Sequence, residues 1–314
     1  MKGLELSRRY FDEYGKKMLE EQFNELLPYI SVGVFGSGSE CYGFDDEISQ
    51  DHDYEAGFII ILPGEDIVDR KSAFQLERAY AKLPKSFMGV ERGKLSPVGG
   101  NRRGVIRAED FFLEKVGKKD GLLEGDEWFA VPENYLAEVT NGEIFMDTGG
   151  VFTSTREYLS TYPKDVKLKK LAGNLLLAKQ AGQYNYKRCL LHGETGAAQL
   201  AVCEFVKAAM QTVFLLNDRY QPYYKWAFRA YGELIKLSDL KSAFEFLLTT
   251  DNAEEDAKTK YAVIEDICAA IAGELKEQSI TKATCTDLEK HAYSVNDFIS
   301  DPVIRNRHIL YAVK

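Results

Sequence analysis

The stretch that decides the fold is residues 33–62, which read GVFGSGSECYGFDDEISQDHDYEAGFIIIL. A short apolar run leads into Gly36 and Ser37, a polar and acidic loop follows, and Asp51 opens a segment that ends in five successive apolar residues. Gly-Ser pairs mark turns, and a continuous apolar run bounded by turns is typical of a strand covered on both faces. We therefore expect a strand, a tight turn and a second strand over residues 51–62.

Two carboxylates stand at the start of the second expected strand. Asp51 and Asp53 are two residues apart, so a strand would point both to one face and His52 to the other. Paired carboxylates suit Mg²⁺ or Mn²⁺, and backbone N–H groups at Gly36 and Ser37, with the serine hydroxyl, suit phosphate. An isolated Asp-x-Asp is more often a solvated strand start. Here the spacing, the flanking strands and the wider resemblance given below together favour phosphoryl or nucleotidyl transfer from a nucleoside triphosphate, with ATP expected.

Composition limits the classes of protein that remain. The chain has 314 residues, so two domains are expected, and 45% hydrophobic residues exclude a wholly disordered chain. The formal net charge of -9 argues against broad adhesion to long nucleic acid or to an anionic membrane, although a local basic groove is compatible with it. Five scattered cysteines without CxxC spacing indicate reduced thiols, and we find neither a signal peptide nor an apolar run that would span a bilayer. We expect a cytoplasmic protein with no membrane partner.

A change of composition near residues 117–126 predicts a domain boundary, with one domain over residues 1–125 and another over 126–314. The expected class is α+β: a small mixed sheet with flanking helices, followed by an antiparallel helical bundle. Periodic apolar residues predict the bundle helices over 163–188, 197–216, 222–235, 237–248, 253–275 and 287–299.

Two further groups of residues are candidates for binding. A glycine-rich basic loop holds Arg102 and Arg103, which are expected either to clamp phosphate or to remain solvated. Lys225 lies in the densest aromatic group of the chain, between Tyr224 and Trp226. That group fits a nucleotide or acceptor pocket and the core of the bundle equally well.

The Gly-Ser turn and the Asp-x-Asp at this spacing resemble the DNA polymerase beta-like nucleotidyltransferase superfamily. The resemblance implies that Gly36 and Ser37 hold phosphate and that Asp51 and Asp53 are the catalytic metal ligands. Four segments, which are spread over most of the chain, also resemble the family DUF4037: GSGSECYGFDDEISQDHD, WFAVPENYLAEVTNGEIFMD, TREYLSTYPKDV and FLLNDRYQPYYKWAFR. The plan of a small catalytic domain and a helical bundle is also similar to kanamycin nucleotidyltransferase.

The chain departs from the superfamily at its third carboxylate. The resemblance places that residue on the strand near Gly104, where this chain has Ile106; Glu55, Glu109 and Asp110 are the alternatives. Because the third carboxylate normally completes the metal site, two functions stay open. One is transfer of a nucleoside monophosphate to a hydroxyl acceptor with release of pyrophosphate; the other is non-catalytic nucleotide binding or regulation. A small molecule, a protein hydroxyl and an RNA end all remain possible acceptors.

Overall fold

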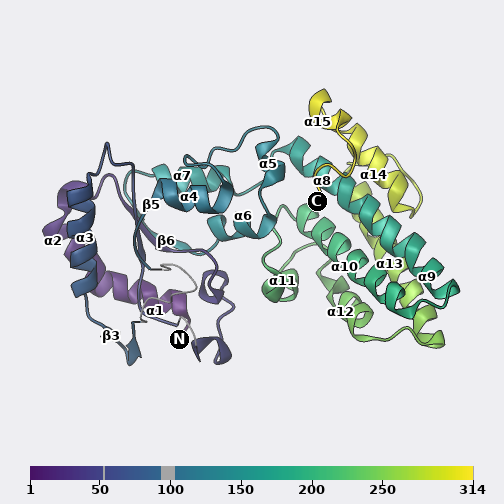
Figure 1. The fold of residues 1–314 in the computed structure, drawn as a ribbon, viewed down its shortest axis with the longest axis horizontal. Coiled ribbons are helices and arrows are strands. Elements are labelled where there is room, and N and C mark those ends of the chain that lie inside the picture. The colour runs from purple at the N-terminus through teal and green to yellow at the C-terminus, as the bar shows by residue number, and fades with distance from the viewer. Residues whose placement is uncertain (52–53, 93–102, 314) are drawn as a thin grey trace. The chain divides into compact units, whose positions relative to one another are not determined.

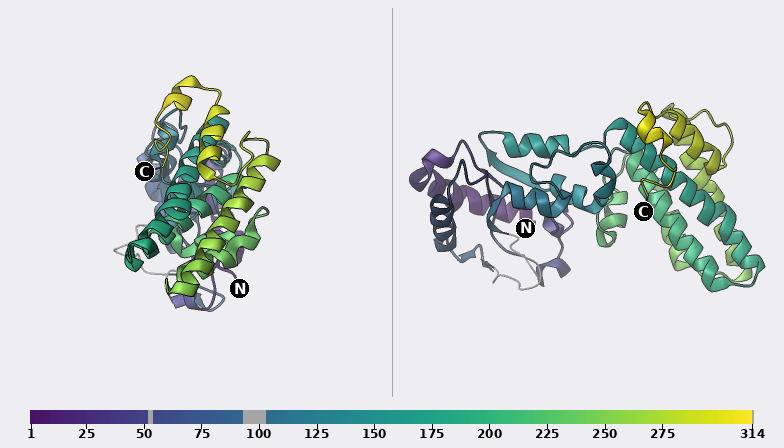
Figure 2. Two further views of the ribbon diagram at one scale, coloured as in Figure 1. Left: turned by 90° about the vertical axis from the view of Figure 1, so that its right-hand side faces the viewer. Right: turned by 45° about the horizontal axis from the view of Figure 1, so that its top comes forward.

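The computed structural model describes residues 1–51, 54–92 and 103–313, and the chain forms two compact units (Figures 1 and 2). Unit 1 comprises residues 1–124 and 131–160, and unit 2 comprises residues 125–130 and 161–314. The class is α+β, as expected. The division expected after residue 125 differs from these units, because residues 131–160 return to unit 1, where they add a strand to its sheet.

Unit 1 is built on a four-stranded mixed sheet with the order β5-β2-β1-β6. Its strands are β1 (Ser31–Val34), β2 (Ile59–Leu62), β5 (Gly104–Arg107) and β6 (Glu143–Asp147). The central strand β1 is antiparallel to both of its neighbours, and β5 runs parallel to β2. A separate hairpin joins β3 (Ser86–Phe87) to β4 (Val90–Glu91).

The strand β2 is shorter than expected, and this overturns one premise about the acidic pair. It begins at Ile59, whereas Asp51 ends a 3-10 helix over Ile48–Asp51. Immediately before β2, the backbone N–H and C=O of Phe58 bond to the hydroxyl of Tyr80, at 3.2 and 2.9 Å. The carbonyl of Phe58 also accepts from the N–H of Gly104 at 3.0 Å, so the tyrosine replaces a strand partner only at the N–H. Asp51 is not on a strand face.

Helices cover both faces of the sheet in unit 1 (Figure 1). The helices on one face are α1 (Gly3–Tyr10), a π-helical turn (Phe11–Gly15), α2 (Lys16–Gln22) and α3 (Arg70–Lys82). Those on the other face are α4 (Ala108–Val116), α6 (Glu133–Thr140) and α7 (Val151–Tyr158). Along β2, Ile60 packs into the core that also holds buried residues of α1, α2 and α3. Ile59 and Ile61 are also buried, so the strand is covered on both sides as expected.

Unit 2 is helical. Its longer helices are α8 (Lys164–Ala178), α10 (Thr195–Leu216), α11 (Tyr224–Tyr231), α12 (Lys241–Thr249), α13 (Glu254–Glu277) and α14 (Leu288–Asp297). The shorter ones are α5 (Glu127–Ala130), α9 (Lys187–Leu191) and α15 (Pro302–Asn306), and a π-helical stretch over Lys179–Tyr186 joins α8 to α9. The main packing is of α8 against α10 and α14.

One bundle helix differs from what the sequence suggested about membranes. By length and composition alone, α10 is apolar enough to cross a bilayer, although no such run was expected. Of its most apolar window, 67% is buried inside the protein, as in the core helix of a bundle. The helix is therefore weak evidence for a membrane span.

Candidate functional site

The end of β1 and the starts of β2 and β5 lie together at one end of the sheet in unit 1. Because β1 and β2 are antiparallel, with Gly33 opposite Ile59, the end of β1 lies beside the start of β2. The start of β5 joins them, since Gly104 pairs with Ile59 in the parallel ladder. The turn after β1, the described residues that enter β2 and the residue before β5 are consequently brought together.

The turn after β1 is held from one side by a single side chain. The N–H of Gly36 donates to Oδ1 of Asn141 at 2.9 Å, and Nδ2 of Asn141 donates to the carbonyl of Gly36 at 2.7 Å. Gly36 has a φ of +116°, which L side chains rarely adopt, and the space where a Cβ would lie is open. The glycine therefore serves the backbone conformation of the turn rather than a close approach.

Because Asn141 takes the N–H of Gly36, the hydrogen-bond donors of the turn begin one residue later than expected. Among the described residues, no acceptor is found for the N–H groups of Ser37, Gly38 and Ser39. The side chain of Ser37 is exposed, and its hydroxyl makes no hydrogen bond within the same residues. Three successive backbone donors and a hydroxyl are therefore available to an oxyanion.

The segment that supplies Asn141 fits tightly against the end of β1. Gly142 has a φ of +68°, and a Cβ there would lie 2.0 Å from the carbonyl oxygen of Val34, so only glycine allows this approach. Its N–H donates to the carbonyl of Cys41 at 2.9 Å. We call Asn141 and Gly142 the splint, because they fix both the turn and the loop after it.

A buried arginine holds the splint in turn. Nε of Arg156 donates to the carbonyl of Val139 at 2.6 Å, and its Nη2 donates to the carbonyl of Asn141. The guanidinium also lies over the ring of Phe35, 5.1 Å from its centroid, and no ion pair with a carboxylate is found among the described residues. Burial lowers the pKa of Arg156 to about 10, which leaves it charged at neutral pH. An uncompensated positive charge therefore lies directly behind the splint.

The loop after the turn closes over a buried ion pair. Nη2 of Arg103 lies 2.8 Å from Oε1 of Glu40, and both side chains are about nine-tenths buried. A Cβ on Gly38 would lie 2.3 Å from that carboxylate. Burial alone would lower the pKa of Arg103, but the charge and hydrogen bond of Glu40, together with the charges of Cys41 and Glu55, outweigh it and the pKa is raised. Arg103, expected as a phosphate clamp, thus braces the loop in this conformation.

The structure describes the expected metal ligands only in part. Asp53 and Arg102 lie outside the described residues, and for Asp51 only the backbone is described. The described residues contain no cluster of three or more His, Cys, Asp or Glu that would hold a metal ion. The metal pair therefore stays a prediction from the sequence.

The alternatives for the third carboxylate separate clearly. A Cβ on Gly64, beyond the far end of β2, would lie 3.0 Å from Oε1 of Glu109, so Glu109 and its neighbour Asp110 stand at the opposite edge of the sheet. Ile106 pairs with Ile61 on β5. Glu55 remains at the site edge, close enough to act on the pKa values of Arg103 and Tyr80.

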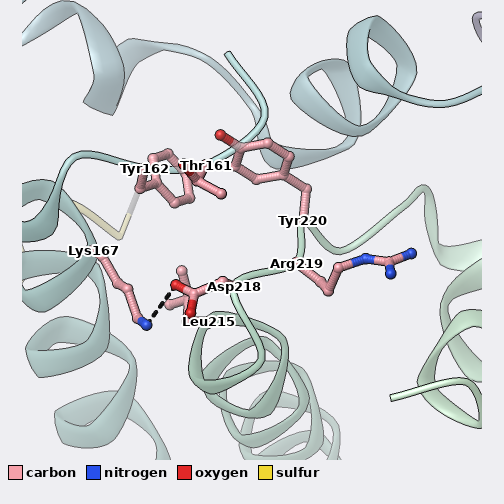
Figure 3. A pocket seen from close by; sticks show the side chains of 7 residues that line it. All are labelled: Thr161, Tyr162, Lys167, Leu215, Asp218, Arg219 and Tyr220. Carbon is pink, nitrogen blue, oxygen red and sulfur yellow. Dashed lines mark hydrogen bonds and ion pairs between the residues drawn. The ribbon is translucent and has the colours of Figure 1, made fainter. Parts of the chain in front are cut away.

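Unit 2 contributes one small hollow and the expected Lys225. The hollow has about 10 Å³ of space for a water-sized group, which is room for one water and not for a nucleotide. Its lining residues are Thr161, Tyr162, Lys167, Leu215, Asp218, Arg219 and Tyr220 (Figure 3). Lys225 lies outside this lining, exposed on α11, with its Nζ 4.9 Å from the centroid of the Trp226 ring. Its role in nucleotide binding stays a prediction.

Comparison with known proteins finds one family model that is similar to the central part of the chain. The model of the domain of unknown function DUF4037 matches residues 128–227. The DUF4037 match crosses both units, because it contains the splint and Arg156 in unit 1 and the start of α11 in unit 2. The splint therefore belongs to the DUF4037 match, whereas the Gly36 turn that it holds lies outside it.

No curated protein matches the chain. Among solved structures, it is similar to a nucleotidyltransferase-like protein from Exiguobacterium sibiricum 255-15. That match has 12% sequence identity and a TM-score of 0.36, and it covers 90% of each chain. A likeness this distant says nothing about what this chain binds.

Three residues of the site were not assigned from the sequence: Asn141, Arg156 and Glu40. Asn141 and Arg156 lie in segments that resemble the family, but no chemistry was attached to them. The signal that was present is the pair Asn141-Gly142 directly before the run EIFM, since an Asn-Gly pair beside an apolar run indicates a turn next to a strand.

Proposed function

We propose that this protein binds a nucleoside triphosphate, ATP in the first instance, together with Mg²⁺ or Mn²⁺. In this proposal it transfers the nucleoside monophosphate to a hydroxyl-bearing acceptor. The observation that carries the proposal is the turn after β1, which Asn141 holds through two hydrogen bonds to Gly36. Its three adjacent backbone donors and the Ser37 hydroxyl lie at the end of the sheet where β2 begins. A preorganised set of N–H groups suits the charged oxygens of a triphosphate.

The residues would divide the work as follows. The N–H groups from Ser37 to Ser39 would bind the outer phosphates, and the charge of Arg156 behind the splint would favour an anion there. Asp51 and Asp53 would hold the metal, which when bound neutralises phosphate charge and orients the triphosphate.

In the transfer step, the oxygen of the acceptor hydroxyl forms a bond to the α-phosphorus while the bond to the bridging oxygen of pyrophosphate breaks. The hydroxyl proton needs a base at the site. Glu55 is the candidate that remains at this edge, because Glu109 and Asp110 stand at the other one.

Non-catalytic nucleotide binding is the second candidate function, and one observation favours it. Glu55 acts on the pKa of Arg103, an arginine already bound to Glu40, so its carboxylate faces a cation of the protein itself. If that interaction is permanent, no carboxylate replaces Ile106, and nucleotide would bind without turnover.

Two measurements on the full chain test the proposal. Isothermal titration with ATP, in Mg²⁺ and in EDTA, measures metal-dependent binding, and an enzyme-coupled assay measures pyrophosphate release with small-molecule, protein and RNA acceptors. Metal-dependent binding with release supports transfer, and binding without release across the panel supports the regulatory alternative. Absence of metal-dependent binding would overturn both.

A further inference from the structure

The segment over residues 219–231, RYQPYYKWAFRAY, differs in charge from the rest of the protein. It contains three basic residues, six aromatic residues and no acidic residue, in a chain whose net charge is -9. It forms the connection after α10 and the whole of α11 in unit 2 (Figure 1). Such a local reversal of charge identifies it as a candidate surface for a polyanion.

The buried and exposed residues of this segment have separate tasks. Ala227 and Tyr231 are buried, and the hydroxyl of Tyr231 donates to the carbonyl of Leu237 at 2.7 Å, so these residues fix α11 in unit 2. In contrast, Tyr223 is 50% exposed and Tyr224 is 75% exposed. Aromatic rings this accessible do not contribute to the core of the bundle. From the sequence alone, a place in the core and a place in a binding pocket were equally expected for this group.

The exposed residues combine aromatic faces with cations. The ring centroids of Tyr223 and Tyr224 are 4.3 Å apart. Next to them, Nζ of Lys225 and Cζ of Arg229 lie 4.9 and 5.6 Å from the centroid of the Trp226 ring. We define the aromatic–cationic patch as Arg219, Tyr223, Tyr224, Lys225, Trp226 and Arg229.

At least two cations of the patch are not neutralised by the protein. Arg219 and Lys225 are exposed, and neither forms an ion pair with a carboxylate in the part of the chain that the structure describes. In Figure 3 the guanidinium of Arg219 extends away from the nearby pair of Lys167 and Asp218, which are 2.6 Å apart. Their charge is therefore available to a ligand.

We propose that the patch binds single-stranded nucleic acid, with bases stacking on Tyr223 and Tyr224 and phosphates contacting Arg219 and Lys225. Unpaired bases offer π-faces that any aromatic ring can stack on, whereas the bases of a duplex are already stacked on each other. A membrane surface is disfavoured, because the exposed large hydrophobic side chains of this segment are tyrosines and none is aliphatic. The inference does not depend on nucleotidyl transfer, but if both hold, the strand supplies the acceptor hydroxyl.

The test is fluorescence anisotropy of the full chain with a labelled oligo(U) or oligo(dT) of about twelve nucleotides. Replacing both tyrosines, in Tyr223→Ala with Tyr224→Ala, should weaken binding at least about 25-fold, because each of the two stacked bases lost costs about five- to 150-fold. Lys225→Ala should reduce the slope of log affinity against log salt by about 0.7, since one phosphate contact is lost.

The unit offers matched controls for both changes. Tyr184 is 52% exposed and has Arg188 over its ring at 5.2 Å, so Tyr184→Ala removes an equivalent aromatic–cation pair elsewhere in unit 2. Lys207 is exposed and paired with Glu204, so Lys207→Ala removes the same charge. Both controls should bind the strand as the wild type does, and all variants should keep the wild-type circular dichroism spectrum.

Three results would overturn the proposal: patch variants that bind as tightly as the controls, a duplex that competes as well as the single strand, or binding to anionic vesicles in preference to the oligonucleotide. Lys225→Glu is a second variant that should fold even if the double tyrosine variant does not, because it reverses an exposed charge and leaves the core intact. It should still weaken binding of the strand. Binding of the strand by Asp51→Asn with Asp53→Asn separates this inference from the proposed transfer.

Discussion

The side-chain amide of Asn141 bonds to both sides of the Gly36 residue, accepting from its N–H at 2.9 Å and donating to its carbonyl at 2.7 Å. The two residues are 105 positions apart, so this contact joins the turn after β1 to the segment that enters β6. An amide that bonds to both groups of one residue fixes the orientation of the peptides that follow. The donors proposed for phosphate are consequently ordered before any ligand binds.

Asn141→Ala should weaken both unit 1 and nucleotide binding. Two hydrogen bonds are lost and the peptide groups of Gly36 are left without their partner, which costs about 1–3 kcal/mol of unfolding free energy. We expect ATP affinity to fall about tenfold in titration calorimetry, because the turn is no longer ordered.

Asn217 in unit 2 provides the matched control. Its amide likewise bonds to the N–H and the carbonyl of one residue, Lys236, at 2.9 and 3.1 Å. Asn217→Ala should destabilise the protein by a similar amount and leave ATP affinity unchanged. A folded Asn141→Ala variant that binds ATP like the wild type would contradict the role of the splint.

Ser37→Ala tests the hydroxyl of the turn alone. The side chain is exposed and bonds to no described residue, so the free energy of unfolding should change by less than about 0.5 kcal/mol. Loss of one hydrogen bond should raise the Kd for ATP about two- to twelvefold. Ser160→Ala, at another exposed serine of unit 1, is the control, and equal Kd values for the two variants would remove Ser37 from the site.

Arg156 is expected to act through its charge and through its hold on Asn141. In Arg156→Met the cation is lost, so ATP affinity should fall about three- to tenfold, while relief from burying an unpaired charge should limit the change in stability to about 2 kcal/mol. Arg156→Lys keeps the charge and should recover part of the affinity. Arg78→Met, at an exposed arginine of α3, controls for net charge. If Arg78→Met weakens ATP binding as much as Arg156→Met does, Arg156 acts only through the net charge of the protein and not through its position behind the splint.

The stability of unit 1 should fall in alkaline solution through Tyr10. Burial raises the pKa of Tyr10 to about 12, against the opposing charge of Arg92, and its hydroxyl donates to the carbonyl of Pro84 at 2.7 Å. The folded state therefore holds this proton more tightly than the unfolded state. Its contribution is complete below pH 10 and is lost between pH 10 and about 12, by at most about 1.4 kcal/mol per pH unit.

Urea unfolding between pH 9 and about 12 measures this dependence. Other buried tyrosines titrate in the same range, so the quantity of interest is the difference between the wild type and Tyr10→Phe. Tyr29→Phe, at a side chain that is 55% exposed, should leave the wild-type slope unchanged. An identical slope in Tyr10→Phe would show that Tyr10 does not carry this proton.

The sequence predicted those parts of the fold that depend on local pattern. The strand expected near Gly104 is β5, and the predicted helix over 197–216 agrees with α10 within two residues. Turn chemistry and periodicity are properties of neighbouring residues, so they can be read without the fold.

The parts that the sequence did not predict depend on contacts between distant segments. No strand was expected over residues 143–147, but they form β6, which is ordered by pairing with β1. Asp51 was expected on a strand, but β2 starts only at Ile59, and the N–H of Phe58 just before it donates to the hydroxyl of Tyr80. Asn141 escaped notice for the same reason, since its importance comes from a partner 105 residues away.

The most direct test of the central claim compares the wild type with the double variant Asp51→Asn, Asp53→Asn in binding of ATP. Titration calorimetry is run with Mg²⁺ and with EDTA, and Glu47→Gln, at an exposed carboxylate of the same loop, is the control. We predict that the double variant binds ATP in Mg²⁺ at least about tenfold, or about 1.4 kcal/mol, more weakly than the wild type. In EDTA the two proteins should bind ATP equally, and the double variant should release no pyrophosphate. Equal affinity for Mg²⁺-ATP in the wild type and the double variant would contradict the claim.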